Sequence, residues 1–339
     1  MESVKQGQLY KYQILTKDNA PSRAQRVLHT DDILFQCVRP YQMNNYMVKG
    51  TMSDIQWVAS TGYAQIRTQT DYPAFLYYVL NTSKYNKAVM VRCTGSSYPA
   101  INSEDLSKIP FYKCGIAEQK KIADFLSLLD ERIATQNKII DKLQSLIKGI
   151  VDCTILRKEK NAIVGDVCLI SEQIRAEANI DDIITVRLHG NGVCKSSAEN
   201  LQLGATQYYR RRAGQLIYGK QNFHNGAIGI VPISLDNGIT SKDIPSFDID
   251  EMKCNSVYLL AQLQSPQYYK PAEALTTGTG SKRLKEETFL KMPIVLPNKR
   301  EQDNIAVLIH RASMNLDHAK RLLELLSIQK QYLLRQMFI

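Results

Sequence analysis

A short run of aromatic and basic side chains is the part of this sequence best suited to binding a polyanion. Tyr208 and Tyr209 are followed directly by Arg210, Arg211 and Arg212. Three adjacent guanidinium groups can contact phosphates as a group, or pair with guanine edges in the major groove of DNA. We therefore expect Tyr209 and the three arginines to bind nucleic acid, the alternative being an ordinary solvated stretch.

Polar hydrogen-bond donors recur at two other places in the second half of the chain. Lys220, Gln221 and Asn222 follow a strand-like run, and Lys282 and Arg283 follow a Gly-rich turn. Amide and basic side chains of this kind pair with adenine edges and with phosphates. The first half carries similar candidates at corresponding places, namely Arg39, Tyr41, Gln42, Asn44, Asn45, Arg92 and Ser96.

No motif for catalysis or for a metal ion accompanies these donors. The sequence lacks a G-x-x-x-x-G-K-[ST] phosphate loop, an H-E-x-x-H zinc motif and a G-x-S-x-G nucleophile motif. The Gly-rich stretch 278–282 has the wrong spacing for a nucleotide site. One acidic loop resembles the carboxylates and lysine of metal-dependent nucleases, and its residues are Asp248, Asp250, Glu251 and Lys253. We expect no catalytic and no metal-binding residue, with a stand-alone metal-dependent nuclease as the alternative.

The composition narrows the class of protein further. Lys and Arg number 43 against 33 Asp and Glu in 339 residues, and the net charge of +10 favours a polyanionic partner. The seven cysteines are scattered without a C-x-x-C pair, so neither a disulfide framework nor a zinc site is expected. No apolar run reaches the roughly 18 residues of a membrane span, and the first residues have no apolar signal-peptide core. These features predict a cytoplasmic protein without a membrane partner.

The two halves of the chain repeat each other at one constant offset in residue number, here called the repeat shift, which carries Pro110 onto Pro293. The same offset matches Thr94-Gly95-Ser96 with Thr277-Gly278-Thr279, Glu118-Gln119 with Glu301-Gln302, and Ile122 with Ile305. A duplicated chain suits a target that itself has two-fold related surfaces, and duplex DNA is the commonest such target. The second half opens with about 30 residues, from Asn161 to about Gly190, whose counterparts would precede Met1. The first copy is therefore expected to be shorter at its N-terminus; alternatively, its missing strands come from another chain or the sequence has been cut short.

Each half ends in a long stretch of helical periodicity, in which apolar residues recur at steps of three and four. The first begins near Ala117 and has no Pro or Gly between Glu118 and Lys148, and the second begins near Arg300. A helix of about 40 residues would be roughly 60 Å long, which is more than one small domain can cover. The two helices are therefore expected to pair as an antiparallel coiled coil; alternatively, each packs on its own domain.

Shorter elements are expected in the globular part of each half. Strand-like runs occur at 33–38, 88–92, 183–188, 215–218 and 227–233. Helical patterns occur at 74–80, with Pro73 in the first turn, and at 256–264. Helices and strands in both halves predict a mixed α/β (α+β) fold.

This order of elements resembles the specificity (S) subunit of type I restriction–modification systems. The resemblance rests on a proline-containing exit from the globular part, followed by Glu-Gln-x-x-Ile and a long helix, at 109–122 and again at 292–305. Three further stretches look like parts of a target recognition domain: 165–167, 214–218 and 276–279. The first exit lacks the second proline that Pro297 supplies in the second half.

The resemblance implies a chain of four parts. A first target recognition domain at 1–112, shortened at its N-terminus, and a second at 159–297 would be separated by two long spacer helices at 113–158 and 298–339. These two helices would form the antiparallel coiled coil.

The resemblance also implies a non-catalytic role in recognising DNA sequence, within a defence against foreign DNA. Each recognition domain would read one half of a bipartite DNA site, and the helices would set the spacing between the halves. The helices would also dock methyltransferase (M) subunits, with two expected, and a motor-nuclease (R) subunit would join for cleavage. This chain would hold no cofactor, because S-adenosylmethionine, ATP and Mg would belong to the partner subunits. A coiled-coil scaffold that binds proteins alone is a further alternative.

Overall fold

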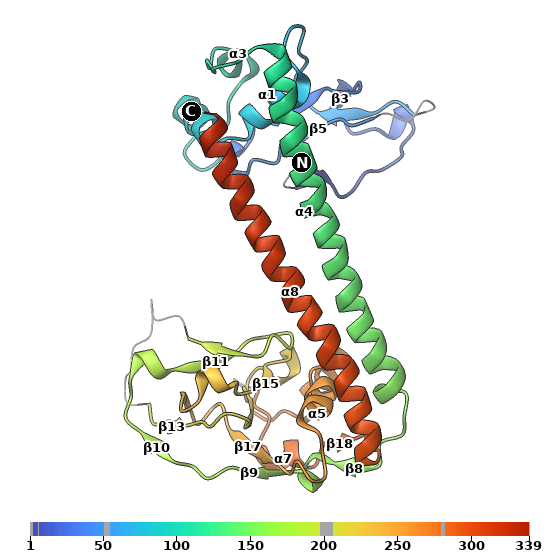
Figure 1. Ribbon diagram of the computed structural model, residues 1–339, viewed down its shortest axis with the longest axis vertical. Helices are drawn as coiled ribbons and strands as arrows, with labels where there is room; N and C mark the ends of the chain where they lie inside the picture. Colours follow the sequence, from blue (N-terminus) through green and yellow to red (C-terminus); the bar gives the residue numbers. More distant parts are fainter. Residues whose placement is uncertain (1–2, 6, 51–54, 197–205, 279–281, 339) are drawn as a thin grey trace. The chain divides into compact units, whose positions relative to one another are not determined.

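The chain folds into two units that are built from the same kinds of elements in the same order. The computed structural model describes residues 3–338 except 6, 51–54, 197–205 and 279–281. Unit 1 comprises Met1–Asn137 and Arg321–Ile339, and unit 2 comprises Lys138–Lys320. Each unit therefore contains a globular part and a segment of each of two long helices, α4 (Ile116–Val151) and α8 (Lys299–Met337) (Figure 1).

The globular part of unit 1 is a mixture of short strands and short helices. Its strands are β1 (Val4–Lys5), β2 (Gln8–Leu9), β3 (Ala24–Val27), β4 (Ile33–Gln36), β5 (Tyr46–Met47), β6 (Val58–Ser60) and β7 (Tyr63–Ile66). Its helices are α1 (Pro73–Leu80), α2 (Ser83–Arg92) and α3 (Ser103–Ser107). The strands pair antiparallel as β5-β4-β7, β3-β6 and β1-β2. All four residues of β4 are buried, and this strand packs with α1 in the core of the unit.

The globular part of unit 2 has more strands around a larger core. Its strands are β8 (Ala162–Ile163), β9 (Cys168–Ile170), β10 (Arg175–Ala176), β11 (Ile184–Val186), β12 (Val193–Lys195), β13 (Tyr208–Arg210), β14 (Leu216–Tyr218), β15 (Ile228–Ile230), β16 (Ile239–Ser241), β17 (Ser246–Ile249) and β18 (Pro293–Ile294). Its helices are α5 (Ser256–Leu263), α6 (Pro266–Tyr269) and α7 (Glu286–Leu290). The strands pair as β15-β14-β17-β9, β10-β13-β16, β11-β12 and β18-β8.

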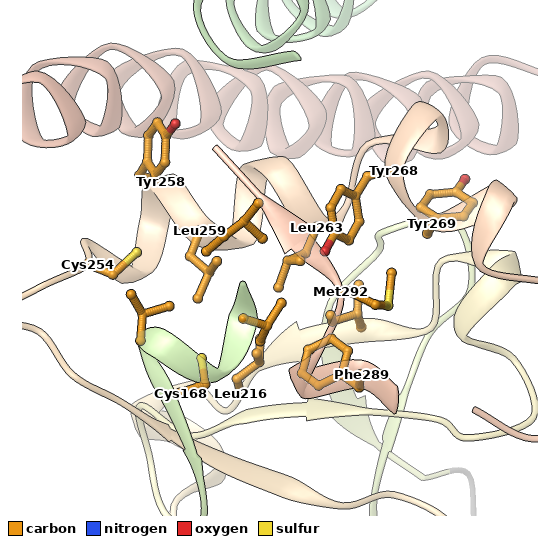
Figure 2. Close-up of a cluster of buried hydrophobic side chains, with 14 of the residues drawn as sticks. Cys168, Leu216, Cys254, Tyr258, Leu259, Leu263, Tyr268, Tyr269, Phe289 and Met292 are labelled. Carbon is orange, nitrogen blue, oxygen red and sulfur yellow. The ribbon is translucent and has the colours of Figure 1, made fainter. Parts of the chain in front are cut away.

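Apolar side chains from α5 and from the four-stranded sheet form the core of unit 2. Figure 2 shows Leu259 and Leu263 of α5 above Leu216 of β14 and Phe289 of α7, whereas Tyr258 of α5 points the other way. None of these five side chains is measurably exposed. Burial raises the pKa of the Cys168 and Cys254 thiols in this core to about 12, so both act as small apolar side chains.

The repeat shift found in the sequence also relates equivalent elements of the structure. It carries both ends of α1 onto the ends of α5, and both ends of α3 onto the ends of α7. The central hairpin keeps its register, because Ile33 pairs with Met47 in unit 1 and Leu216 pairs with Ile230 in unit 2. The repeat is therefore a repeat of backbone structure as well as of residue types.

Two expected elements differ from the structure. Residues 88–92 were expected to be a strand but form the end of α2, because the Thr82 hydroxyl caps this helix and Tyr85 and Val89 bury the same helical face. The strand expected at 227–233 is shorter, since β15 ends at Ile230 and Pro232 leads into a turn of 3-10 helix. Tertiary packing decides both cases.

Within each unit the two long helices run antiparallel. In unit 1, Lys330 of α8 pairs with Asp130 of α4, and Phe338 packs with Ile122 near the start of α4. In unit 2, the last turns of α4 pack against the first turns of α8 in the main core, through Val151 and Ile309. A π-helical turn, Asp152–Leu156, follows α4. The paired helices expected from the apolar periodicity are confirmed.

A buried glutamine at the start of each long helix joins that helix to its globular part. In unit 2, Gln302 Oε1 accepts the Asn255 N–H at 2.9 Å, and its Nε2 donates to the carbonyls of Pro297 and Lys253 at 2.8 and 3.1 Å. Both glutamines are almost fully buried, with exposed fractions of 2 % for Gln119 and 1 % for Gln302.

Unit 1 repeats two of these three hydrogen bonds. Gln119 Oε1 accepts the Tyr72 N–H at 2.9 Å, and its Nε2 donates to the Cys114 carbonyl at 2.9 Å and to Asp71 Oδ1 at 3.0 Å. The repeat shift carries Tyr72 onto Asn255 and Cys114 onto Pro297. The Glu-Gln motif of the sequence repeat thus marks a side chain that fastens helix to domain in both units.

A second hydrogen bond occurs in both units, but the positions of its Gln and Asp are exchanged between them. In unit 1, Gln65 Nε2 donates to Asp32 Oδ2 at 2.7 Å; in unit 2, Gln215 Nε2 donates to Asp248 Oδ1 at 2.9 Å. Burial alone would raise the pKa of Asp32, but hydrogen bonds from Arg67, the His29 N–H and Gln65 outweigh it and lower that pKa to about 2.

Replacing Gln119 by alanine is expected to destabilise unit 1 by about 2 kcal/mol, because the Tyr72 N–H and the Cys114 carbonyl would lose their partner. The fluorescence of Trp57, the single tryptophan, reports unfolding of this unit during urea titration. The exposed Gln144 of α4 is the control, and Gln144→Ala should change the free energy of unfolding by less than about 0.5 kcal/mol. Equal effects of both substitutions would contradict the role of Gln119.

Asp32→Asn should lower the stability of unit 1 in a pH-dependent way. Because the pKa of Asp32 is about 2 in the folded chain and about 3.8 when unfolded, its contribution is present above pH 4 and is lost as the pH falls towards 2. The difference from the native chain should be about 1–2 kcal/mol at pH 7 and shrink between pH 4 and 2. Urea titrations followed at Trp57 measure it, with exposed Asp18→Asn as control. A difference that stays constant from pH 7 to 2 would contradict the assignment.

Candidate nucleic-acid interface

In unit 2 the chain leaves β14 in a tight turn whose backbone is held from two sides. The Lys220 N–H donates to the Asp243 carbonyl and the Lys220 carbonyl accepts the Leu284 N–H, both at 2.9 Å. The side chain of Phe223 is fully buried and anchors the turn in the core. Gln221 and Asn222 are exposed on its outer side. The sequence thus places two amide side chains on a rigid turn.

A second loop lies beside this turn and carries two cations. Thr277 and Arg283 exchange both backbone hydrogen bonds, at 3.0 and 2.9 Å, so the loop between them is closed at its base. The Leu284 bond to Lys220 joins this base to the first turn. Arg283 pairs with Asp243, and Lys282 pairs with Glu273, both at 3.3 Å and all about half-exposed. Such exposed pairs are weak, so these cations can exchange their partner for a phosphate.

Unit 1 contains the same pair of loops. Thr94 and Ala100, which the repeat shift carries onto Thr277 and Arg283, exchange the same two backbone hydrogen bonds at 2.9 Å. The turn after β4 is joined to this loop by the Arg39 N–H, which donates to the Pro99 carbonyl at 2.8 Å. The Arg39 guanidinium also lies over the Tyr98 ring, 4.5 Å from its centroid.

The expected donors of unit 1 are distributed between surface and interior. Tyr41, Gln42 and Ser96 are exposed, and Arg39 is half-buried, so these four remain candidates for contact with DNA. Arg92 is exposed at the end of α2, where its guanidinium donates to the Ala88 carbonyl. Asn44 is half-buried and its backbone N–H donates to Gln36 Oε1.

The prediction that Asn45 contacts DNA is wrong, because its side chain is only 2 % exposed. The side chain stabilises the turn from inside. Its Oδ1 accepts the Gln36 N–H at 2.8 Å, and its Nδ2 donates to Asn81 Oδ1 at 3.2 Å. An amide with both ends bonded within the protein cannot read a base edge. Asn45 shapes the turn that presents Gln42.

The prediction that Arg211 binds nucleic acid is also wrong, because its guanidinium is fully buried. It donates to Thr240 Oγ1 at 2.7 Å, to Ser246 Oγ at 2.9 Å and to the Ile244 carbonyl at 2.9 Å. Burial lowers its pKa to about 10, so it remains charged at neutral pH. By holding Ile244, Arg211 fixes the segment whose neighbour Asp243 contacts both loops.

The neighbours of Arg211 do face outwards. Arg210 and Arg212 are exposed, and Tyr209 is half-buried with its ring beside the Arg211 guanidinium. Arg210 lines a polar cavity of 680 Å³ together with Asp181 and Asp236.

The prediction that the Lys220 side chain contacts DNA is wrong in part, because this side chain is only 12 % exposed and forms an ion pair with Glu286 at 2.7 Å. Its charge is thus balanced within the protein, and its backbone does the positioning.

Sequence reasoning missed two residues of this surface. Asp243 connects the two loops of unit 2, and Tyr98 stacks on Arg39 in unit 1. Tyr98 could have been found, because it follows Ser96-Ser97 in an otherwise polar turn. Asp243 carries no signal of its own, since its role depends on which backbone groups lie beside it.

The acidic loop weighed as a nuclease centre is closed on itself. The Asp250 carboxylate accepts the Met252 N–H at 3.1 Å and pairs with Lys253 at 3.3 Å. Among the described residues, no three His, Cys, Asp or Glu side chains come together in a way that could hold a metal ion. Three residues of the Gly-rich stretch, 279–281, lie outside the described part of the chain. No helix in the described ranges is long and apolar enough to span a membrane.

Comparison with protein families adds a decisive observation. Residues 3–145 match the family described as type I restriction modification DNA specificity domain. This stretch, which is less than half of the chain, is thus similar to a type I specificity domain. A comparison with curated protein sequences gives no match.

Solved structures resemble the chain along nearly all of its length. The crystal structure of a type I restriction–modification system S subunit from M. genitalium has a TM-score of 0.64 at 12 % identity, covering 96 % of this chain and 92 % of that chain. A structure from work on complex assembly and conformational transition of the type I R-M system has a TM-score of 0.52 at 17 % identity, covering 98 % and 87 %. The HsdS subunit from Thermoanaerobacter tengcongensis aligns with a TM-score of 0.42 at 18 % identity, covering 99 % and 88 %. The first two likenesses support the fold of this chain beyond residue 145.

Substitutions of the buried Arg211 and of the exposed Arg212 are expected to have different effects on DNA binding and on stability. Arg212→Gln is expected to lower the slope of log K against log salt for duplex DNA by about one, because an exposed cation can neutralise a phosphate. Arg211→Met should leave that slope unchanged and lower the stability by about 3 kcal/mol, because it leaves buried acceptors without a donor. Binding is measured by fluorescence anisotropy, and stability by urea titration under circular dichroism. A reduced slope in the Arg211 variant would contradict its interior role.

Proposed function

We propose that each unit of this specificity chain reads one half of a bipartite DNA site through its pair of loops. The observation that carries the proposal is the repeated loop pair, closed by Thr94 and Ala100 in unit 1 and by Thr277 and Arg283 in unit 2. Each pair presents exposed donors on a fixed backbone. Rigid presentation favours base-edge contacts, which need defined geometry.

The candidate contacts divide by chemistry. Exposed amides suit base edges, and they are Gln42 in unit 1 with Gln221 and Asn222 in unit 2. The cations suit phosphates and fix the register on the duplex, and they are Arg39, Arg92, Arg210, Arg212, Lys282 and Arg283. The net charge of +10 favours association with DNA over the whole chain.

The long helices are proposed to set the spacing between the half-sites and to dock two M subunits. In unit 1, α4 and α8 line an apolar groove of 620 Å³ where Phe125 and Leu322 are about half-exposed. Their counterparts at the repeat shift, Leu308 and Ile139, are 52 % and 40 % exposed in unit 2. Exposed apolar side chains on both units suit two equivalent partners. S-adenosylmethionine, ATP and Mg are assigned to the partners, including an R subunit, and no cofactor to this chain.

Mapping modified adenines in cells tests the division of labour. The chain is expressed with a type I methyltransferase subunit, and its DNA is sequenced for methylated sites. Arg39→Gln with Gln42→Ala should relax one half of the methylated motif, and Asn222→Ala with Arg283→Gln should relax the other half. Each lost base-edge contact is expected to cost about 1–3 kcal/mol, a loss of about fivefold or more in discrimination, whereas a lost phosphate contact should weaken binding to all sequences.

The control is Gln144→Ala on α4, which should leave both halves unchanged. A motif whose two halves change together in either loop variant, or in neither, would overturn the assignment of one half to each unit.

A further inference from the structure

An apolar groove in unit 1 lies where the end of α8 meets the start of α4. It has a volume of 360 Å³ and is lined by residues of α1, α2, the exit stretch 110–114, Glu118 of α4 and Phe338. Within the exit stretch, Tyr112 is 83 % exposed. The groove thus combines apolar side chains with one carboxylate, Glu118, and two lysines, Lys84 and Lys113.

The corresponding place in unit 2 is filled by the chain itself. After α4 and its π-helical turn, residues 158–164 run across the exit stretch of that unit. Lys158 forms an ion pair with Glu301, and Lys160 Nζ lies 5.8 Å from the centroid of the Tyr268 ring.

Backbone pairing continues along the same segment. The Asn161 side chain brackets Leu296, donating to its carbonyl at 3.0 Å and accepting its N–H at 2.7 Å. Strand β8 then pairs antiparallel with β18, with Ile163 opposite Pro293. Val164 enters the core with no measurable exposure. The segment is therefore basic where it begins and aliphatic where it ends.

Five of the residues that hold this segment have their counterparts in the lining of the unit 1 groove. At the repeat shift, the pairs are Glu301 with Glu118, Tyr268 with Tyr85, Leu296 with Lys113, Ile294 with Phe111, and Pro293 with Pro110. Because five equivalent pairs share one repeat shift, the unit 1 groove corresponds to the surface that residues 158–164 cover in unit 2.

The exit stretch is buried in unit 2, where residues 158–164 cover it, and is more exposed in unit 1. Val295 in unit 2 is 4 % exposed beneath its segment, whereas its counterpart Tyr112 is 83 % exposed. Ile294 is fully buried, whereas Phe111 is half-buried. A covering segment would remove this apolar surface from water.

We propose that the unit 1 groove docks an extended peptide segment of a partner polypeptide, with the chemistry of residues 158–164. Its basic residue pairs with Glu118, a second lysine lies over Tyr85, an asparagine brackets the Lys113 backbone, and aliphatic residues pair with Pro110 and enter the groove. Backbone pairing gives affinity, and the alternate side chains give specificity. The proposal is independent of DNA recognition.

A second edge extends the proposed site. In unit 2, β9 follows the segment and pairs with β17. The counterpart of β17 in unit 1 is β7, which pairs with β4, and no described strand pairs with its other side. A longer peptide should therefore bind more tightly than a short one.

Peptide binding to the intact chain tests the proposal directly. A labelled peptide of residues 157–170 of this sequence is titrated with the protein, and its fluorescence anisotropy is recorded. Saturable binding is expected, weaker for residues 157–164 and absent for a scrambled peptide. Glu118→Lys should weaken binding about fivefold, and the peptide carrying Lys158→Glu should recover it on that variant.

The control is Glu104→Lys, an exposed carboxylate outside the groove, which should leave binding unchanged. Trp57 fluorescence checks that each variant is folded. Three outcomes would overturn the proposal: no saturable binding, equal binding of the scrambled peptide, or no recovery in the charge swap. Dimerisation of the chain alone, abolished by Glu118→Lys, would make a second copy the occupant and also overturn it.

Discussion

The amide of one buried glutamine in each unit determines how a long helix leaves a globular domain. Gln302 and Gln119 each accept one backbone N–H and donate to the carbonyl just before the helix. A carboxylate could accept but not donate, and an apolar residue could do neither. Because both ends of the amide are used, the direction of the first helical turn is fixed with respect to the exit stretch.

The same interaction can occur at equivalent positions of the two units even where the residue types differ. The bond between Asp32 and Gln65 in unit 1 reappears between Gln215 and Asp248, with donor and acceptor positions exchanged. Arg211 offers the opposite case, since its counterpart Leu28 lies in a small apolar cluster. One buried site is thus satisfied by a hydrogen-bonded cation in one unit and by aliphatic packing in the other.

Sequence patterns predicted what depends on periodicity and order, and missed what depends on neighbours. The repeat shift, the two long helices and the resemblance to the specificity family could be recognised because they involve many residues at regular spacing. Arg211 and Asn45 were misplaced because residue type alone does not show whether a polar side chain is solvated or bonded inside. The strand expected at 88–92 failed for the same reason, since the burial of Tyr85 and Val89 favours the helix.

The half-exposed ion pairs of the unit 2 loop have a consequence for selectivity. Lys282 and Arg283 are already neutralised by Glu273 and Asp243, which act as built-in counterions. A cation that reaches a phosphate releases a counterion condensed on the DNA, but here it must also give up a tethered carboxylate that does not diffuse away. Any polyanion must therefore compete with groups held at a high local concentration. A duplex of the wrong sequence, offering phosphates but no matching base edges, gains little from that exchange.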